Sequence, residues 1–88
     1  MCSKNIVVQN QVGLHSRSAT YFINKANEFK STIWVEKEER QANAKSLLGV
    51  LSLGVTGGND IKIIADGPDD EAAVEALCGL IRAGLVEQ

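Results

Sequence analysis

The sequence has few of the residues on which several common functional classes depend. Its 88 residues include one histidine and two cysteines, and lysine and arginine form no cluster. Cys2 and Cys78 stand near opposite ends, without a CxxC pair or a histidine at ligand spacing, so we expect reduced thiols, no zinc or other metal site and no cofactor. The missing basic cluster argues against direct binding to nucleic acid.

Long apolar runs are missing as well. No run approaches the roughly 18 residues needed to span a bilayer, and the start, MCSKNIVVQN, lacks the apolar segment of a signal peptide. We therefore expect a cytoplasmic protein without membrane insertion. Apolar residues make up 44 % and charged residues 23 % of the chain, as in globular domains, and the length predicts one domain over residues 1–88.

The apolar pattern predicts four strands and three helices. The expected strands are 5–8, 32–37, 40–44 and 60–65, and the expected helices are 16–27, 46–54 and 70–83. This order, βαββαβα, favours an α+β open-faced sandwich in which a four-stranded antiparallel sheet carries all three helices on one face. Trp34 and Ile64 would then lie on the other face, where they would need cover or would be partly exposed.

The second and third strands are close enough in sequence to form a hairpin. Its turn would be Glu38-Glu39, an unusual pair because neither residue tolerates a positive φ as glycine or asparagine does. At the other end of the chain, Gly84 is a plausible end for the last helix.

Segment 46–54 is apolar on two sides of a helix. At ~100° per residue, Val50 and Leu53 fall on one side and Leu47, Leu48 and Leu51 on the other. Because so small a domain cannot easily bury both sides, we predict that Val50 and Leu53 face the core. Leu47, Leu48 and Leu51 would form an exposed apolar surface for a partner, called the leucine patch below.

The only histidine, His15, stands in GLHSRSA at the expected start of the first helix. The unpaired N–H groups and positive dipole of a helix N-terminus favour a neutral imidazole with a nucleophilic nitrogen and stabilise an attached phosphoryl group. Arg17 falls opposite the apolar arc of the helix, where its guanidinium would bind phosphate oxygens, and Gly13 would permit a tight backbone entry. These residues alone leave a plain helix cap beside a solvated arginine as the simpler interpretation.

GLHSR together with NAKSLLGVLSLG, residues 43–54, resembles the HPr family of phosphocarrier proteins in the bacterial phosphoenolpyruvate-dependent sugar phosphotransferase system. The resemblance runs from the first strand to the last helix and implies the fold expected above. It also implies that enzyme I, charged by phosphoenolpyruvate, passes a phosphoryl group to Nδ1 of His15, which hands it to a histidine on a sugar-specific IIA component. Such a protein is a carrier without turnover of its own, and we expect it to be a monomer.

The resemblance also assigns supporting residues. Arg17 would assist transfer, the backbone of Ser16, Arg17 and Ser18 would support the phosphate, and Thr20 and the leucine patch would dock the partners. The family usually has proline where this chain has Ser18, which keeps an N–H and adds a hydroxyl, so phosphate stabilisation would survive or gain a donor. The usual glycine of the hairpin turn is also absent.

Ser46 has two interpretations. Its position predicts the N-cap of the short helix. In Gram-positive relatives the matching serine is phosphorylated by an HPr kinase/phosphorylase, and the product acts with a catabolite control protein. Alternatives to the sugar carrier are a regulatory relative that binds a repressor, a carrier in a nitrogen-related branch, and an interaction module that uses only the leucine patch. Phosphorylation of His15 would support a carrier, without excluding one in the nitrogen-related branch.

Overall fold

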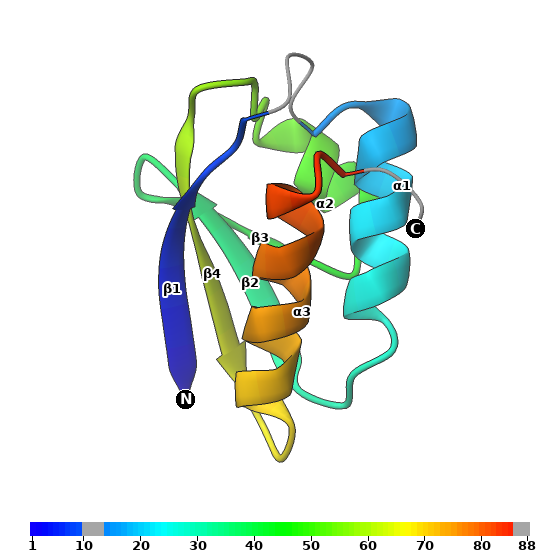
Figure 1. Ribbon diagram of the computed structural model, residues 1–88, viewed down its shortest axis with the longest axis vertical. Helices are drawn as coiled ribbons and strands as arrows, with labels where there is room; N and C mark the ends of the chain where they lie inside the picture. The colour runs from blue at the N-terminus through cyan, green and yellow to red at the C-terminus, as the bar shows by residue number, and fades with distance from the viewer. Residues whose placement is uncertain (10–13, 86–88) are drawn as a thin grey trace.

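The computed structural model describes residues 1–9 and 14–85, and its elements follow the predicted order (Figure 1). The elements are β1 (Cys2–Val7), α1 (Ser16–Ala26), β2 (Thr32–Lys37), β3 (Arg40–Asn43), α2 (Leu47–Ser52), β4 (Asp60–Asp66) and α3 (Asp70–Arg82). All seven expected elements are confirmed, and every end except the start of β1 lies within two residues of its expected position.

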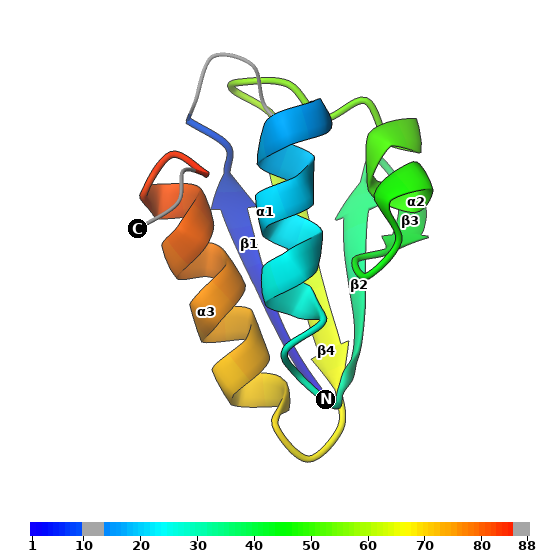
Figure 2. The same cartoon turned by 90° about the vertical axis from the view of Figure 1, so that its right-hand side faces the viewer.

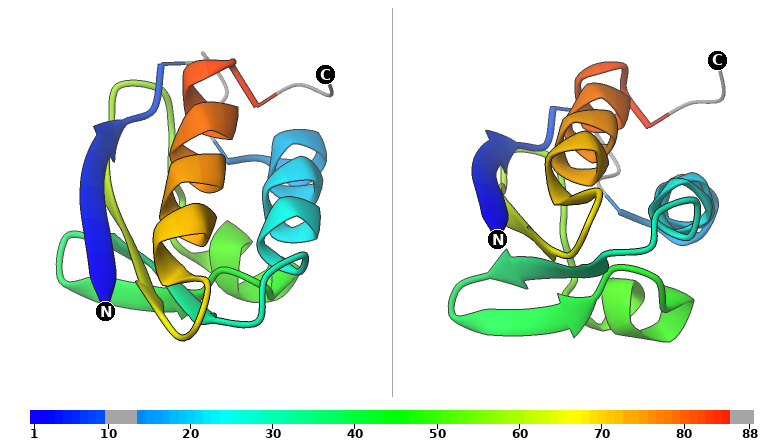
Figure 3. Two further views of the ribbon diagram at one scale, coloured as in Figure 1. Left: turned by 60° about the horizontal axis from the view of Figure 1, so that its bottom comes forward. Right: turned by 90° about the horizontal axis from the view of Figure 1, so that it is seen from below.

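The sheet is four-stranded and antiparallel, in the order β1-β4-β2-β3. The helices lie on one side of it (Figures 2 and 3), and α3 runs between β1 and α1 (Figures 1 and 3). The predicted open-faced sandwich is therefore confirmed.

Strand β1 begins three residues earlier than expected. The stretch CSKN shows no apolar alternation, but Cys2 already pairs with Ala65 of β4. Lys4 also bridges to α3, with its Nζ 3.3 Å from Oε1 of Glu75. Pairing with a neighbouring strand thus extends β1 beyond the segment that local pattern identifies.

The core lies between the sheet and the helices. The sheet buries alternate residues of its two central strands, Ile33 and Val35 on β2 and Ile61, Ile63 and Ala65 on β4. Trp34 and Ile64, paired across β2 and β4 on the open face, are half-buried. The largest fully buried side chains include Phe22, Ile33, Val35, Val50, Ile61, Ile63, Val74, Leu77 and Ile81.

The turn between β2 and β3 is the expected one. Glu38 has φ 50° and Glu39 has φ 69°, so both turn residues occupy the left-handed region. They connect the facing pair Lys37 and Arg40. Two consecutive positive φ values match a type I′ hairpin turn, whose twist suits the flanking strands but whose conformation favours asparagine and glycine.

Helix α3 ends at Arg82, and the glycine expected to stop it, Gly84, follows the C-cap Ala83 with φ 86°. The Leu85 N–H donates to the Leu80 carbonyl at 2.9 Å, and the Gly84 N–H donates to the Ile81 carbonyl at 3.0 Å. This is a Schellman arrangement, in which the left-handed residue turns the chain back over the last helical carbonyls.

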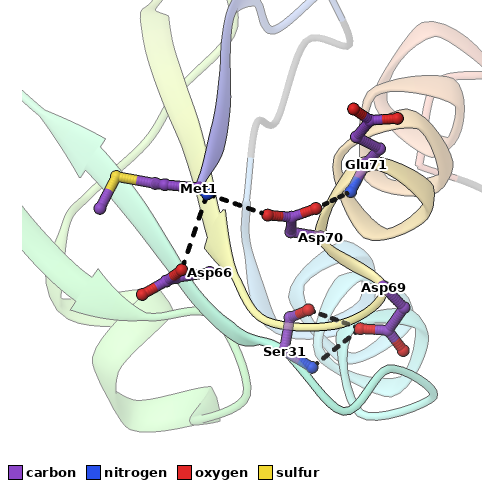
Figure 4. A network of polar contacts seen from close by, with 6 residues as sticks. All are labelled: Met1, Ser31, Asp66, Asp69, Asp70 and Glu71. Atoms are coloured by element: carbon purple, nitrogen blue, oxygen red, sulfur yellow. Dashed lines mark hydrogen bonds and ion pairs between the residues drawn. The ribbon is translucent and has the colours of Figure 1, made fainter.

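A polar network closes the end of the molecule opposite the start of α1 (Figures 1 and 4). The Asp69 carboxylate accepts from Ser31 Oγ at 2.5 Å, from the Ser31 N–H at 2.9 Å and from the Lys30 N–H at 2.9 Å. These hydrogen bonds, from the Ser31 hydroxyl first, lower the pKa of Asp69 to about 2. Beside this network the Met1 amino group lies 3.2 Å from Oδ2 of Asp70.

Candidate functional site

His15 is the N-cap of α1. Its backbone is extended, with φ −106° and ψ −176°, and its carbonyl accepts the Ala19 N–H at 2.6 Å as the first bond of the helix. The side chain is exposed. The imidazole therefore stands in solvent at the end of the helix where backbone N–H groups have no helical carbonyl to bind and the dipole is positive.

Ser18, three residues after the N-cap, holds the backbone of His15. Its Oγ accepts from the His15 N–H at 3.0 Å and donates to the His15 carbonyl at 3.3 Å. The two residues form a capping box. Ser18 is only 8 % exposed, and its hydroxyl bonds the His15 backbone.

Leu14 fixes the chain on the other side of His15. Its side chain is 3 % exposed within the core, and its N–H donates to the carbonyl of Val55 at 3.0 Å. Neither Leu14 nor Val55 was expected in the site. A leucine directly before an exposed histidine nevertheless indicates that the chain is anchored in the core at that point. Gly13, for which a role in exposing the ring was expected, lies outside the described residues.

Arg17 and Thr20 are exposed on α1, whereas Ala19, Phe22 and Ala26 on its opposite face are fully buried. The prediction that Arg17 points away from the core is confirmed. Within residues 1–9 and 14–85, its guanidinium has no ion pair or hydrogen bond. Arg17 thus presents its charge to solvent two residues after the histidine.

The leucine patch has the predicted exposure. Leu48 is 75 % exposed and Leu47 and Leu51 are each 38 % exposed, whereas Val50 and Leu53 are buried. Helices α1 and α2 contact each other on the same side of the sheet (Figure 2). The fold therefore brings the helix that starts at His15 and the helix that carries the leucine patch together.

Ser46 is the N-cap of α2, as predicted. Its Oγ accepts from the Gly49 N–H at 3.2 Å, and the side chain is half-buried. Its neighbour Lys45 donates from Nζ to the Phe29 carbonyl at 2.6 Å, which ties the start of α2 to the loop after α1. The short helix is thus positioned at its N-terminal end by the side chain of its cap and by that of the residue before the cap.

Two cations of the β2–β3 hairpin hold the other end of α2. Lys37 Nζ donates to the carbonyl of Gly54 at 3.0 Å, and Arg40 donates to the carbonyl of Ser52 at 2.9 Å. Cations at the C-terminal end of a helix satisfy unpaired carbonyls and oppose the negative end of its dipole. Local pattern could not identify these residues, because their role depends on the hairpin folding back against the helix.

Residues 1–9 and 14–85 contain no group of three or more histidine, cysteine or acidic side chains that could hold a metal ion. In the same residues, no helix has both the length and the apolar character needed to cross a membrane.

Known proteins match almost the whole chain. The family model described as "PTS HPr component phosphorylation site" matches residues 2–83. The chain belongs to the HPr family. The resemblance of GLHSR and residues 43–54 to HPr phosphocarriers of the phosphotransferase system is thereby confirmed.

Individual HPr relatives are similar over most of their length. HPr-like protein Crh of Halalkalibacterium halodurans is 40 % identical over 92 % of this chain and 96 % of the relative. Phosphocarrier protein HPr of Neisseria meningitidis is 37 % identical over 92 % of this chain and 91 % of the relative. The crystal structure of HPr-C-His from Thermoanaerobacter tengcongensis is 44 % identical, with a TM-score of 0.95, and the match covers 100 % of this chain and 99 % of that chain.

Proposed function

We propose that this HPr-family chain accepts a phosphoryl group on His15 from phosphorylated enzyme I and passes it to the IIA components of sugar permeases. The observation that carries the proposal is an exposed imidazole at the N-cap of α1, two residues before an exposed arginine. The family match over residues 2–83 supports the same assignment.

The chemistry requires little from the protein beyond position and charge. A lone pair of the neutral imidazole attacks phosphorus, so that a P–N bond forms as the bond between phosphorus and enzyme I breaks. The positive end of α1 and Arg17 oppose the charge of the phosphoryl oxygens, and the backbone N–H groups of Ser16, Arg17 and Ser18 are the nearest helical donors. One arginine and an open helix end bind the group without enclosing it, as suits a group that must leave.

Partner docking is proposed for the two contacting helices. Thr20 on α1 and the leucine patch on α2 are exposed, and an apolar patch beside a charged reactive group fits a protein partner that also presents its reactive group at the interface. We further propose that the carrier acts in the cytoplasm, as a monomer and without a cofactor. Light scattering at micromolar concentration would test its oligomeric state.

The carrier role is tested by incubation with enzyme I and phosphoenolpyruvate. We expect an acid-labile, base-stable phosphoryl adduct that is lost in His15→Ala and retained in Ser46→Ala. Addition of a IIA component should discharge it. Failure of the unaltered protein to form the adduct with active enzyme I would refute the carrier assignment.

A second, regulatory function is favoured by the Crh relatives, which are 40 % and 35 % identical to this chain. Crh of Bacillus subtilis is described as a catabolite repression protein. We propose that Ser46 is phosphorylated by an HPr kinase/phosphorylase and that the product binds a catabolite control protein. The added charge would lie at the start of α2, beside the leucine patch, and would weaken docking to enzyme I.

The regulatory proposal has its own assay. Incubation with ATP and an active HPr kinase/phosphorylase should give an acid-stable adduct that is absent from Ser46→Ala and still present in His15→Ala. No adduct on the unaltered protein would count against this role while leaving the carrier role unaffected.

A further inference from the structure

The N-cap of α1 is occupied by an unusual residue type. Serine, threonine, aspartate and asparagine are the preferred N-cap residues, but the N-cap of α1 is the exposed His15. The residue that reaches back to the His15 backbone is Ser18, at the third position of the helix. The capping hydroxyl therefore belongs to the third residue of the helix, and the N-cap itself carries the group that we propose to be reactive.

We propose that Ser18 is a positioning residue for phosphoryl transfer at His15. This inference rests on the carrier function proposed above. Ser18 Oγ accepts from the N–H of His15 at 3.0 Å and donates to its carbonyl at 3.3 Å, so one buried hydroxyl bonds both peptide groups that flank the His15 Cα. The Ser18 hydroxyl therefore fixes the backbone from which the imidazole projects, and in the same capping box the His15 side chain accepts from the Ser18 N–H.

Leu14 completes the restraint from the preceding side. Its side chain is buried, and its N–H is bonded to Val55. His15 therefore lies between an apolar anchor and a hydrogen-bonded anchor, although its own side chain is in solvent. Without Ser18 Oγ, the His15 backbone would lose two of its hydrogen bonds at the end of a helix, where chains fray.

The choice of a hydroxyl also suits the charge of the reaction. The usual partner in a capping box is glutamate or glutamine at the third helical position. A glutamate here would bring a negative charge close to the phosphoryl group on His15, whereas the Ser18 hydroxyl is neutral. Ser18 thus holds the N-cap without repelling the transferred group.

Loss of the Ser18 hydroxyl should affect the rate of phosphoryl transfer more than the affinity for the partner. Phosphoryl transfer depends on alignment of the attacking and leaving atoms, and a misplacement of about 1 Å can cost about 100-fold in rate. Removal of one neutral hydrogen-bonding group is expected to slow the transfer step about fivefold. Partner affinity should not change, because Ser18 is buried and cannot contact a partner.

Single-turnover transfer from phosphorylated enzyme I tests the proposal. We would compare the unaltered protein with Ser18→Ala, with Ser18→Thr, which keeps the hydroxyl, and with Ser3→Ala as a matched change on an exposed part of β1. Circular dichroism would select a temperature at which all four are folded. We expect Ser18→Ala to lower the maximal rate about fivefold at unchanged half-saturating concentration, Ser18→Thr to restore it, and Ser3→Ala to match the unaltered protein.

Amide hydrogen exchange at the His15 N–H provides a readout that does not depend on enzyme I. We expect exchange about fivefold faster in Ser18→Ala, with Ser18→Thr close to the unaltered protein. Unchanged exchange or an unchanged maximal rate in Ser18→Ala would overturn the positioning role, as would a change confined to the half-saturating concentration. If the unaltered protein accepts no phosphoryl group, the proposed function and this role both fail, while the exchange result still reports the hydrogen bond itself.

Discussion

Replacement of Glu39 by glycine should stabilise the protein. Glu39 is exposed and has φ 69° at the second central position of the β2–β3 turn, where type I′ hairpins favour glycine. A residue with a Cβ is strained there because the Cβ approaches the following carbonyl oxygen. Glycine removes that contact and leaves the pairing of Lys37 with Arg40 intact.

The expected magnitude follows from two opposing terms. A left-handed conformation costs a residue with a Cβ roughly 1–2 kcal/mol, and the greater backbone entropy of glycine in the unfolded chain opposes roughly 0.5–1 kcal/mol of that relief. The net increase in the free energy of unfolding is therefore about 0.5–1 kcal/mol. For a domain of this size, that corresponds to a rise in Tm of about 3–6 °C.

Urea denaturation followed by circular dichroism provides the measurement, and Glu39→Ala is the matched control. Alanine removes the same charge as glycine but keeps the Cβ, so Glu39→Gly should be more stable than Glu39→Ala. Equal stability of the two variants would refute the strain argument, because any gain would then come from the lost charge. Phosphoryl transfer to His15 should be unchanged in both, since the turn lies outside the proposed docking helices.

Three further predictions concern α2 and the Asp69 network. Leu48→Asp should slow transfer from enzyme I about tenfold without lowering Tm, whereas Val7→Asp, on the exposed open face of the sheet, should leave the transfer rate unchanged. Equal transfer rates in the two variants would remove the leucine patch from the interface. The pKa of Asp69 is lowered in the folded state, so its carboxylate contributes fully to the stability of the fold above about pH 4, and this contribution is lost as pH falls toward 2. Asp69→Asn should remove this part of the pH dependence of Tm, and an unchanged dependence of Tm on pH would contradict the prediction. Arg40→Gln should accelerate amide exchange at the C-terminal end of α2, whereas Lys4→Gln, which removes an exposed ion pair, should leave that exchange rate unchanged. An exchange rate in Arg40→Gln equal to that of the unaltered protein would show that the guanidinium does not stabilise this end of the helix.

Periodicity was sufficient to predict features that depend on one element. The two sides of α2 follow from helical geometry alone, and the structure buries Val50 while exposing Leu48. The outward position of Arg17 follows from the same geometry on α1. The turn at Glu38-Glu39 was also identifiable, because it joins two strands that only a short connection separates.

Features that depend on distant contacts were not predictable. The Asp69 carboxylate, just before α3, accepts hydrogen bonds from Ser31, 38 residues earlier, and no local pattern indicates this contact. The cations Lys37 and Arg40 stabilise α2 only because the hairpin folds back onto its last carbonyls. The start of β1 was missed for the same reason, since β4 supplies the hydrogen bonds that local sequence does not indicate.

The two proposed phosphorylation sites are both N-cap residues with extended backbone, yet they differ in how far the helix start depends on the modified side chain. The imidazole of His15 is exposed, and the hydrogen bonds between Ser18 Oγ and the His15 backbone do not involve the imidazole, so this half of the capping box would persist when a phosphoryl group is gained or lost. The Ser46 hydroxyl is itself the cap, because it accepts from the Gly49 N–H at the start of α2. Phosphorylation at Ser46 would therefore change the hydrogen bonding of the helix that carries the leucine patch. On this basis His15 is suited to a rapid relay, and Ser46 to a slower modification that acts by altering a docking helix.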